Sequence, residues 1–367
     1  MTLFLPTTAL FYITNQCNLS CRHCSVSSGP ESIRKNELLN EDGAVHVVGV
    51  CQALGLKSLT LTGGEAFLRE DLGNILERSK ANCFQINIDT NLTYLPQYTE
   101  KIISEGLFHN LHISIDGATP KSHNFIRGNG SFEQTINNIH RIQNYIAEYK
   151  KENEIKLALT TVITNTNHNE LKNIISLAKQ LQISKIKFEQ LVLSGRAKKN
   201  EVQLAIKGEK LLKAYENIMS AALSEETLQI KSNMFTNIFI EHYNKKFQTS
   251  LPFSYYSCTS PQQYIYISYD GTVVPCAIYT KQSGYSSWSA EEKQSLSIIN
   301  NNFEDILWSR PFKQFFESKT SPEIQNRLQP CNVCKFHGNL CMPCISNVLA
   351  GRDPTFELCK AVLESNS

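Results

Sequence analysis

The sequence has no marked excess of either charge, no apolar run of membrane length and no recognisable export signal. It holds 36 Lys and Arg residues against 34 Asp and Glu residues, a net charge of +2 over 367 residues. Nucleic-acid-binding surfaces usually require a clear basic excess, so this balance argues against such a partner. The apolar segment Leu3–Ile13 lacks a basic start and a cleavage site, and it is far shorter than a bilayer span. We therefore expect a cytoplasmic protein that has no membrane partner.

Cysteine, by contrast, is abundant, with 12 residues. Disulfides are rare in a reducing compartment, so grouped cysteines there indicate metal sites. Cys51 and Cys83 stand alone in segments with helix-like and strand-like patterns, and we expect them to be ordinary small core residues. The other ten fall into two groups: Cys17, Cys21 and Cys24, then Cys258, Cys276, Cys331, Cys334, Cys341, Cys344 and Cys359.

Short apolar runs alternate with helical patterns between about residues 9 and 190. This alternation predicts parallel, right-handed βα units. We expect a partial (β/α)6 TIM-type barrel, or an open doubly wound sheet, with the chemistry at the carboxyl ends of the strands. The expected strands are Leu10–Ile13, Ser58–Leu61, Phe84–Ile88, Leu111–Ile115, Leu157–Ile163 and Lys185–Phe188.

Local signals predict where several elements begin and end. Asn40 is the expected N-cap of one helix, Gly55 its stop, and Ser131 the cap of another. Further helices are expected at Glu209–Leu223 and Ser232–Lys246.

The sequence pattern changes beyond residue 255. An Asp270-Gly271 turn predicts a hairpin. Residues 281–302 suggest a loop, followed by short helices over 303–318.

Cys17, Cys21 and Cys24 lie within eight residues, directly after the first expected strand. A [4Fe–4S] cluster normally takes four cysteines, so three leave one iron open to an outside ligand. A zinc site would need a fourth ligand. His23 could supply it, although its place between two cysteines makes chelation cramped. A cluster, a zinc ion and an unliganded triad all remain open from these residues alone.

The C-x3-C-x2-C spacing of the triad resembles that of the radical S-adenosylmethionine (SAM) superfamily. The resemblance covers roughly Phe11 to Ala197. It implies that SAM chelates the open iron and that one electron splits SAM into methionine and a 5′-deoxyadenosyl radical. That radical then abstracts hydrogen from the substrate, with the cofactor carrying the difficult chemistry.

Gly63-Gly64-Glu65 ends the second strand and is similar to the family's GGE motif. Taken alone it could be a plain strand-end turn. The resemblance implies that the glycines let the backbone approach the ligand and that the Glu65 carboxylate holds the SAM ammonium group. The family usually has proline next, where this chain has Ala66.

Three further segments resemble family features. Ser114, in Ser-Ile-Asp-Gly, and Arg127 would contact the SAM ribose or carboxylate, although a turn serine and a solvated arginine are the plain alternatives. Thr90-Asn91 resembles the family's TNG segment, with Leu92 in place of glycine. Gly195 would pass close to the adenine, or it is simply a linker glycine.

The second group of cysteines admits two interpretations. Two C-x2-C pairs between Cys331 and Cys344 could form a zinc ribbon. The whole set resembles the SPASM domain, a small cysteine-rich α+β domain. Its pattern differs here because Cys341 sits one residue late.

The SPASM resemblance implies two cluster-binding sets. Cys258, Cys276 and Cys344 would hold one auxiliary cluster, and Cys331, Cys334, Cys341 and Cys359 a second. We therefore expect one or two auxiliary [4Fe–4S] clusters beside the SAM-binding one. The expected domains are a radical SAM barrel over 1–200, a helical linker over 201–255 and a SPASM domain over 256–367.

SPASM-type members mostly act on ribosomally made peptides or on protein side chains. We expect peptide maturation through a crosslink, a thioether or epimerisation, with an anaerobic sulfatase-maturing (formylglycine-generating) enzyme as the alternative. Rivals of other classes are a non-enzymatic iron–sulfur carrier and a zinc-dependent nucleic-acid binder. Expected partners are the peptide or protein substrate and an electron donor such as flavodoxin or ferredoxin. Because the chain begins almost at its first strand, we expect either a separate leader-peptide-binding protein or direct recognition of the peptide by the barrel. The sequence identifies no catalytic acid or base.

Overall fold

The computed structural model describes residues 6–30, 39–80, 84–232, 234–254, 263–277, 288–318, 321–322, 324, 331, 334–338, 340–341, 344 and 357–365. The strands found there form a 9-stranded sheet in the order β7-β6-β5-β4-β3-β2-β1-β8-β9. Neighbours pair parallel, except that β8 and β9 are antiparallel. The strands are β1 (Thr8–Thr14), β2 (Ser58–Gly63), β3 (Gln85–Thr90), β4 (Asn110–Ser114), β5 (Lys156–Ile163), β6 (Lys185–Gln190), β7 (Gln229–Ser232), β8 (Tyr264–Ile267) and β9 (Val273–Val274).

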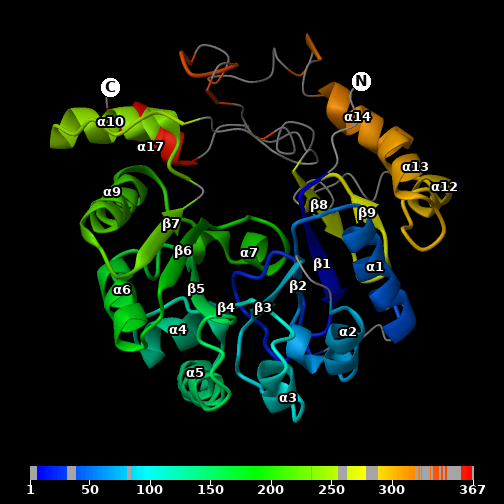
Figure 1. The fold of residues 1–367 in the computed structure, drawn as a ribbon. Coiled ribbons are helices and arrows are strands. Elements are labelled where there is room, and N and C mark those ends of the chain that lie inside the picture. Colours follow the sequence, from blue (N-terminus) through cyan, green and yellow to red (C-terminus); the bar gives the residue numbers. More distant parts are fainter. Residues whose placement is uncertain are drawn as a thin grey trace.

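Helices cover the outer side of this curved sheet, as Figure 1 shows for α1, α2, α3, α5 and α6. Near the C-terminus, α17 packs on α9 and α10. The helices are α1 (Glu41–Ala53), the 3-10 helix η2 (Ala66–Leu68), α2 (Leu72–Arg78), α3 (Thr99–Ser104), α4 (Pro120–Arg127), α5 (Ser131–Glu148), α6 (Leu171–Gln180), α7 (Gly195–Lys199), α8 (Glu201–Leu204), α9 (Gly208–Ser224), α10 (Asn237–Phe247), α12 (Ala290–Gln294), α13 (Phe303–Trp308), α14 (Arg310–Ser318) and α17 (Glu357–Ser365).

Strands β1 to β6 lie in chain order and confirm the expected partial, parallel barrel, which stays open. Three strands extend the sheet beyond this expectation. β7 pairs with β6 although it lies inside residues 201–255, which the sequence suggested were all helical. β8 pairs parallel with β1, so the hairpin expected at residues 264–274 continues the barrel sheet. The sequence of β7 is polar and only its Ile230 is buried, so its hydrophobic pattern does not indicate a strand.

Some local expectations are confirmed and others are wrong. The side chain of Asn40 accepts a 2.9 Å hydrogen bond from the Gly43 N–H and caps α1 as expected. Ser131 is the first residue of α5 rather than its cap, and its hydroxyl group donates to the Gly128 carbonyl over 2.7 Å. The loop expected at 281–302 contains the short helix α12, closed by a capping box between Ser289 and Glu292.

The core lies between the sheet and the outer helices. The strand residues that face the helices are fully buried, including Leu61, Ile88 and Ile113. Cys51 belongs to this core, as expected, whereas Cys83 lies outside the described residues. In the described part of the chain, we find no helix with the length and apolarity needed to cross a membrane.

Candidate functional site

The cysteine triad lies in the loop that follows β1, at the carboxyl edge of the sheet. The Arg22 N–H donates to the Ile126 carbonyl of α4 over 2.8 Å. From the other side, Arg196 of α7 donates to the loop twice, from Nε to the Cys21 carbonyl over 2.8 Å and from its backbone N–H to the Cys24 carbonyl over 2.9 Å. Two helices therefore hold this loop, and Arg196 has a part in it that the sequence pattern did not indicate.

The three thiols of the triad influence one another. Cys17 and Cys21 are buried and Cys24 is half-buried. Burial raises the pKa of the Cys17 thiol to about 12, and repulsion from Glu65, Cys21 and Cys24 acts in the same direction, against a hydrogen bond from the Leu19 N–H. Thiols in this setting lose their protons readily only to a metal, which supplies the compensating positive charge. This donor set fits an iron–sulfur cluster.

The structure gives the side chain of His23 a partner outside the triad. His23, the suggested fourth zinc ligand, instead places its Nε2 2.8 Å from Oδ2 of Asp116.

Gly63 and Gly64 let two backbone segments come together. A Cβ atom at Gly63 would lie 2.1 Å from the Thr14 carbonyl oxygen, and one at Gly64 would lie 2.1 Å from that of Gln16. The Gly64 N–H donates to Thr14 over 2.9 Å, and the Glu65 N–H to Gln16 over 2.8 Å. These glycines therefore allow a close approach to the backbone that leads into the triad, a contact that the sequence did not suggest.

Glu65 is fully buried and its carboxylate binds protein groups. Oε1 accepts from the Thr90 hydroxyl over 2.7 Å and from the Phe67 N–H over 3.1 Å, while Oε2 accepts from the Asn91 N–H over 2.7 Å. Burial raises the pKa of this carboxyl group, against the hydrogen bonds and the positive charge of Arg127, which lower it. The structure thus joins the Gly-Gly-Glu and Thr-Asn segments, which the sequence had treated separately.

Asn91 continues this connection to the triad. Its Nδ2 lies 3.8 Å from the Cys17 sulfur and 3.0 Å from Oδ1 of Asn18. The next residue, Leu92, has φ of 54°, a left-handed conformation that costs a non-glycine residue roughly 1–2 kcal/mol. This is the position at which the resembling family has glycine, so the departure seen in the sequence falls on a residue whose backbone favours glycine.

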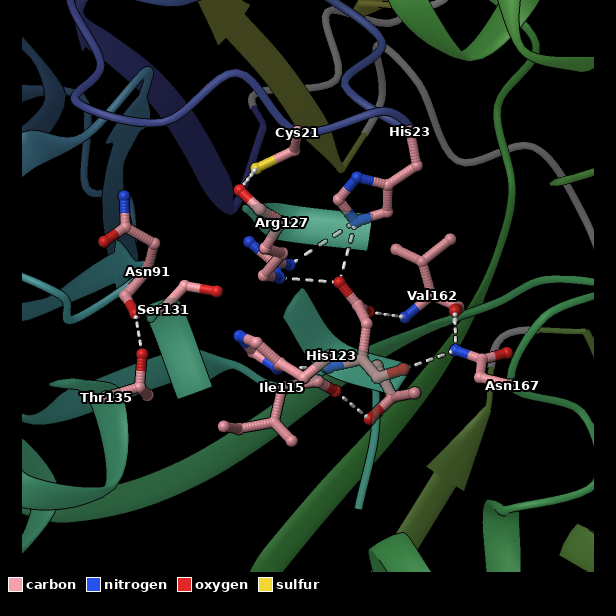
Figure 2. Close-up of polar contacts among 12 residues, drawn as sticks. Cys21, His23, Asn91, Ile115, His123, Arg127, Ser131, Thr135, Val162 and Asn167 are labelled. Atoms are coloured by element: carbon pink, nitrogen blue, oxygen red, sulfur yellow. Dashed lines mark hydrogen bonds and ion pairs between the residues drawn. The ribbon is translucent and has the colours of Figure 1, made fainter. Parts of the chain in front are cut away.

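A buried ionic network lies next to Cys21 and His23 of the triad loop (Figure 2). Asp116, just past the end of β4, is fully buried, and Arg127 donates to it from Nε over 2.6 Å. Burial would raise the pKa of Asp116, but attraction to Arg127 and His23 outweighs it and holds that pKa well below its usual range. The sequence suggested Arg127 and missed Asp116, although an acid beside a strand-end glycine was a usable signal.

Ser114 and Gly195 occupy different surroundings. Ser114 ends β4, half-buried and in register with Thr160 of β5. Gly195 has φ of 54°, and a Cβ there would lie 2.8 Å from the Cys24 carbonyl oxygen and 2.7 Å from that of Ser25. Gly195 thus packs on the triad loop, a contact that the sequence did not suggest.

Several C-terminal cysteines influence one another electrostatically. Burial raises the pKa of Cys359 to about 12, with further contributions from Cys341, Cys331 and Cys334, against a hydrogen bond to Thr236. Burial also raises the pKa of Cys341 to about 11, with contributions from Cys334 and Cys331. These four are the set expected to hold the second auxiliary cluster.

The first auxiliary set is described only in part. Cys276 is buried and Cys344 is half-buried. Cys258 lies outside the described residues.

Charged and polar pairs line the concave face of the sheet, a feature that the sequence did not reveal. Nδ1 of His112 lies 2.9 Å from Oδ1 of Asp89, and Nζ of Lys187 lies 2.5 Å from Oε1 of Glu189. These side chains alternate with the buried residues that face the outer helices, and each remains partly exposed. The inner face of the open barrel therefore carries carboxylate, imidazole and ammonium groups close together.

Comparisons with known proteins agree with this arrangement. Residues 11–178 match the Radical SAM superfamily, and residues 258–335 match the SPASM iron-sulfur cluster-binding domain. The chain is 24% identical to an AdoMet-dependent heme synthase of Methanosarcina barkeri over 94% of its own length and 93% of the relative. It is 30% identical to a GTP 3′,8-cyclase of Petrotoga mobilis, over 50% of this chain and only 57% of that protein.

Two solved structures share the fold over nearly the whole chain. SuiB of Streptococcus suis, bound to S-adenosylmethionine, superposes with a TM-score of 0.74 at 15% identity, over 98% of this chain and 78% of SuiB. Native anSMEcpe with bound AdoMet gives a TM-score of 0.68 at 16% identity, over 98% of this chain and 95% of anSMEcpe.

Proposed function

We propose that this chain, which belongs to the radical SAM superfamily and carries a C-terminal SPASM domain, modifies a ribosomally made peptide by hydrogen abstraction. The product would be a crosslink, a thioether or an epimerised residue. The chain is an enzyme whose cofactors are [4Fe–4S] clusters and SAM. Bound at the triad, the cluster and SAM supply the one-electron cleavage that yields the abstracting radical. Cys17, Cys21 and Cys24 would hold that cluster.

The observation that carries the peptide proposal is the extent of the shared fold. Likeness to SuiB and anSMEcpe runs through the C-terminal region as well as the barrel. SuiB has been solved with its precursor peptide SuiA, and it matches this chain with a TM-score of 0.72 in that form. The anSMEcpe structure with the Cp18Cys peptide matches with a TM-score of 0.64.

The concave face supports a substrate with many polar groups. Asp89 with His112, and Lys187 with Glu189, offer donors and acceptors of both charges. Nδ2 of Asn110 also donates to Oδ1 of Asn87 over 2.6 Å on the same face. A peptide backbone, which carries a donor and an acceptor in nearly every residue, can hydrogen-bond to the exposed sides of such groups.

The residues around the triad would place SAM. The Gly63-Gly64-Glu65 segment and Asn91 shape one side of the loop, and Arg127 leaves guanidinium nitrogens beyond its bond to Asp116. Arg127 is thus suited to a carboxylate. Ser114 and Gly195 remain candidate SAM contacts at the carboxyl edge.

In the C-terminal region, Cys331, Cys334, Cys341 and Cys359 would hold one auxiliary cluster. Cys258, Cys276 and Cys344 would hold another, with one coordination position left for a further donor. A flavodoxin or ferredoxin would supply the electron, and a separate leader-peptide-binding protein would present the substrate.

Two other reactions have specific support. An anaerobic sulfatase-maturing activity fits the match that covers 95% of anSMEcpe. Against it, Ser25-Val26-Ser27-Ser28 follows the triad, where such enzymes tend to have an aromatic residue. A reaction on a tetrapyrrole fits the match to the heme synthase, which spans both domains.

The test is an anaerobic assay of the iron-reconstituted chain with SAM and dithionite. 5′-Deoxyadenosine should form, and a synthetic peptide encoded beside the gene should lose a pair of hydrogen atoms or exchange a Cα hydrogen for solvent deuterium. Parallel reactions contain a Cys-type sulfatase peptide and an iron porphyrin. Turnover of either of these in place of the neighbouring peptide would overturn the peptide proposal while leaving SAM cleavage intact.

A further inference from the structure

One carboxylate ties the triad loop to the sheet edge and to α4. Asp116 accepts from the Val162 N–H of β5 through Oδ1 over 2.8 Å. Its Oδ2 accepts a 2.6 Å hydrogen bond from Nε of Arg127 and lies 2.8 Å from Nε2 of His23 (Figure 2). The three partners come from a strand, a helix and the triad loop, and none of them lies near another in the sequence.

The protonation of this network follows from its geometry. Asp116 is flanked by a guanidinium and by donors on both oxygens, so it acts as an ionised acceptor. His23 must then carry its proton on Nε2. Nη2 of Arg127 lies 3.5 Å from the same nitrogen, so with this tautomer two donors face each other there. Nδ1 of His23 is buried and has no hydrogen-bond partner in the structure. The network therefore fixes the ring of His23 through Nε2 and leaves Nδ1 without a hydrogen-bond partner.

The same carboxylate keeps a positive charge beside the thiols. The side chain of Arg127 is 9% exposed, and its charge favours the thiolate of Cys21. A buried guanidinium without a partner is strongly unfavourable, so the carboxylate of Asp116 stabilises Arg127 in its buried position. Loss of Asp116 would free both His23 and Arg127.

We propose that Asp116 is a positioning residue for the SAM-binding cluster, which acts by fixing the imidazole of His23 and the guanidinium of Arg127 against the triad loop. The inference rests on the proposed placement of that cluster on Cys17, Cys21 and Cys24. Asp116 would act through His23 and Arg127, which are its side-chain partners. Groups of this kind behind a metal's ligands commonly change metal retention by about ten- to a hundred-fold when replaced.

The test compares three variants of the full, reconstituted chain. Asp116→Asn removes the charge and turns one acceptor into a donor. His23→Leu removes one tie and leaves the carboxylate in place. Glu216→Gln is the matched control, because Glu216 is also a buried carboxylate that accepts from a histidine and a cation, namely His242 at 2.7 Å and Lys246 at 2.8 Å. Glu216 lies on α9, outside the triad network.

Two measurements other than turnover are made on each variant: the rate of iron loss from the triad cluster to a chelator, and its reduction potential by electron paramagnetic resonance. Asp116→Asn should lose triad iron about ten- to a hundred-fold faster, and its potential should rise because a nearby negative charge is gone. His23→Leu should also lose iron faster, and Glu216→Gln should match the wild type in both measurements.

Several outcomes would overturn the inference. One is an Asp116→Asn variant with wild-type iron retention. Another is rapid iron loss from Asp116→Asn with none from His23→Leu, which would leave charge alone as the cause. A third is an equal effect in Glu216→Gln, which would indicate general destabilisation. If Asp116→Asn fails to accumulate, His23→Leu alone decides. A wild-type chain that takes up no cluster on the triad would overturn the proposed function as well.

Discussion

The hydroxyl group of Thr90 donates a 2.7 Å hydrogen bond to Oε1 of Glu65, and this bond joins the ends of β2 and β3. The other carboxylate oxygen accepts from the Asn91 N–H, and the side chain is completely buried. Glu65 therefore helps to shape the carboxyl edge of the sheet before any ligand binds. A substitution there should affect both folding and SAM binding.

Replacement of Glu65 by Gln should lower the free energy of unfolding by about 1–3 kcal/mol, because the amide group sets a donor against a donor in a buried site. SAM affinity should fall about ten- to a hundred-fold if the carboxylate also contacts the ammonium group. Urea unfolding and equilibrium SAM binding measure the two effects separately. Wild-type stability together with wild-type affinity would contradict both roles.

Gly64→Ala should be strongly disruptive, since its Cβ would meet the Gln16 carbonyl oxygen at 2.1 Å. Backbone oxygen atoms cannot move aside as a flexible side chain can, so we expect a loss of at least ~2 kcal/mol and weaker SAM binding. Gly49→Ala in α1 is the control, because a Cβ there meets no atom within 4 Å. That control should gain about 0.5–1 kcal/mol. Equal behaviour of the two variants would rule out the close approach described above.

His123 should make the protein less stable in mild acid. Burial and the charge of Arg127 lower the pKa of its imidazole to about 3, with Asp116 opposing them. The unfolded chain, with a histidine pKa of about 6.5, then binds more protons than the folded one between these values. The contribution of neutral His123 to the free energy of unfolding is fully present above about pH 6.5. It falls with decreasing pH, by up to ~1.4 kcal/mol per pH unit.

Denaturant unfolding of wild type and His123→Asn from about pH 7 to about pH 4.5 measures this slope. Asn is the chosen replacement because its Oδ1 can accept from the Asp116 N–H, as Nδ1 of His123 does over 3.3 Å. The difference in slope between the two proteins isolates His123 from the carboxyl groups. Identical slopes would show that His123 titrates normally.

Changing Cys17, Cys21 and Cys24 together to Ala should abolish 5′-deoxyadenosine formation and leave the C-terminal clusters in place. The wild type should hold about twelve irons per chain and this variant about eight, since each cluster contains four. Iron analysis and Mössbauer spectra provide the count. About four irons in the variant would mean that one auxiliary set is wrong. Single changes at Cys258 and Cys359 would then identify which one.

Much of this protein could be predicted from short-range patterns. The triad spacing and the Gly-Gly-Glu motif were readable because their residues are close in the chain. The six strands β1 to β6 and their order could be predicted because apolar runs that alternate with helices favour parallel pairing in chain order. β7 escaped prediction because a short, polar edge strand has almost no buried side chain to create a pattern.

The sequence by itself determined which residues are candidate ligands, namely three cysteines after the first strand and a cysteine-rich tail, because residue type and spacing are local properties. Only the tertiary structure decided how the site is held together. The contact of Gly195 with the triad loop, the bond of Glu65 to Thr90 and the network around Asp116 all join segments far apart in the chain. Such contacts depend on which strand ends become neighbours and on what burial leaves unpaired, and neither can be read from sequence spacing.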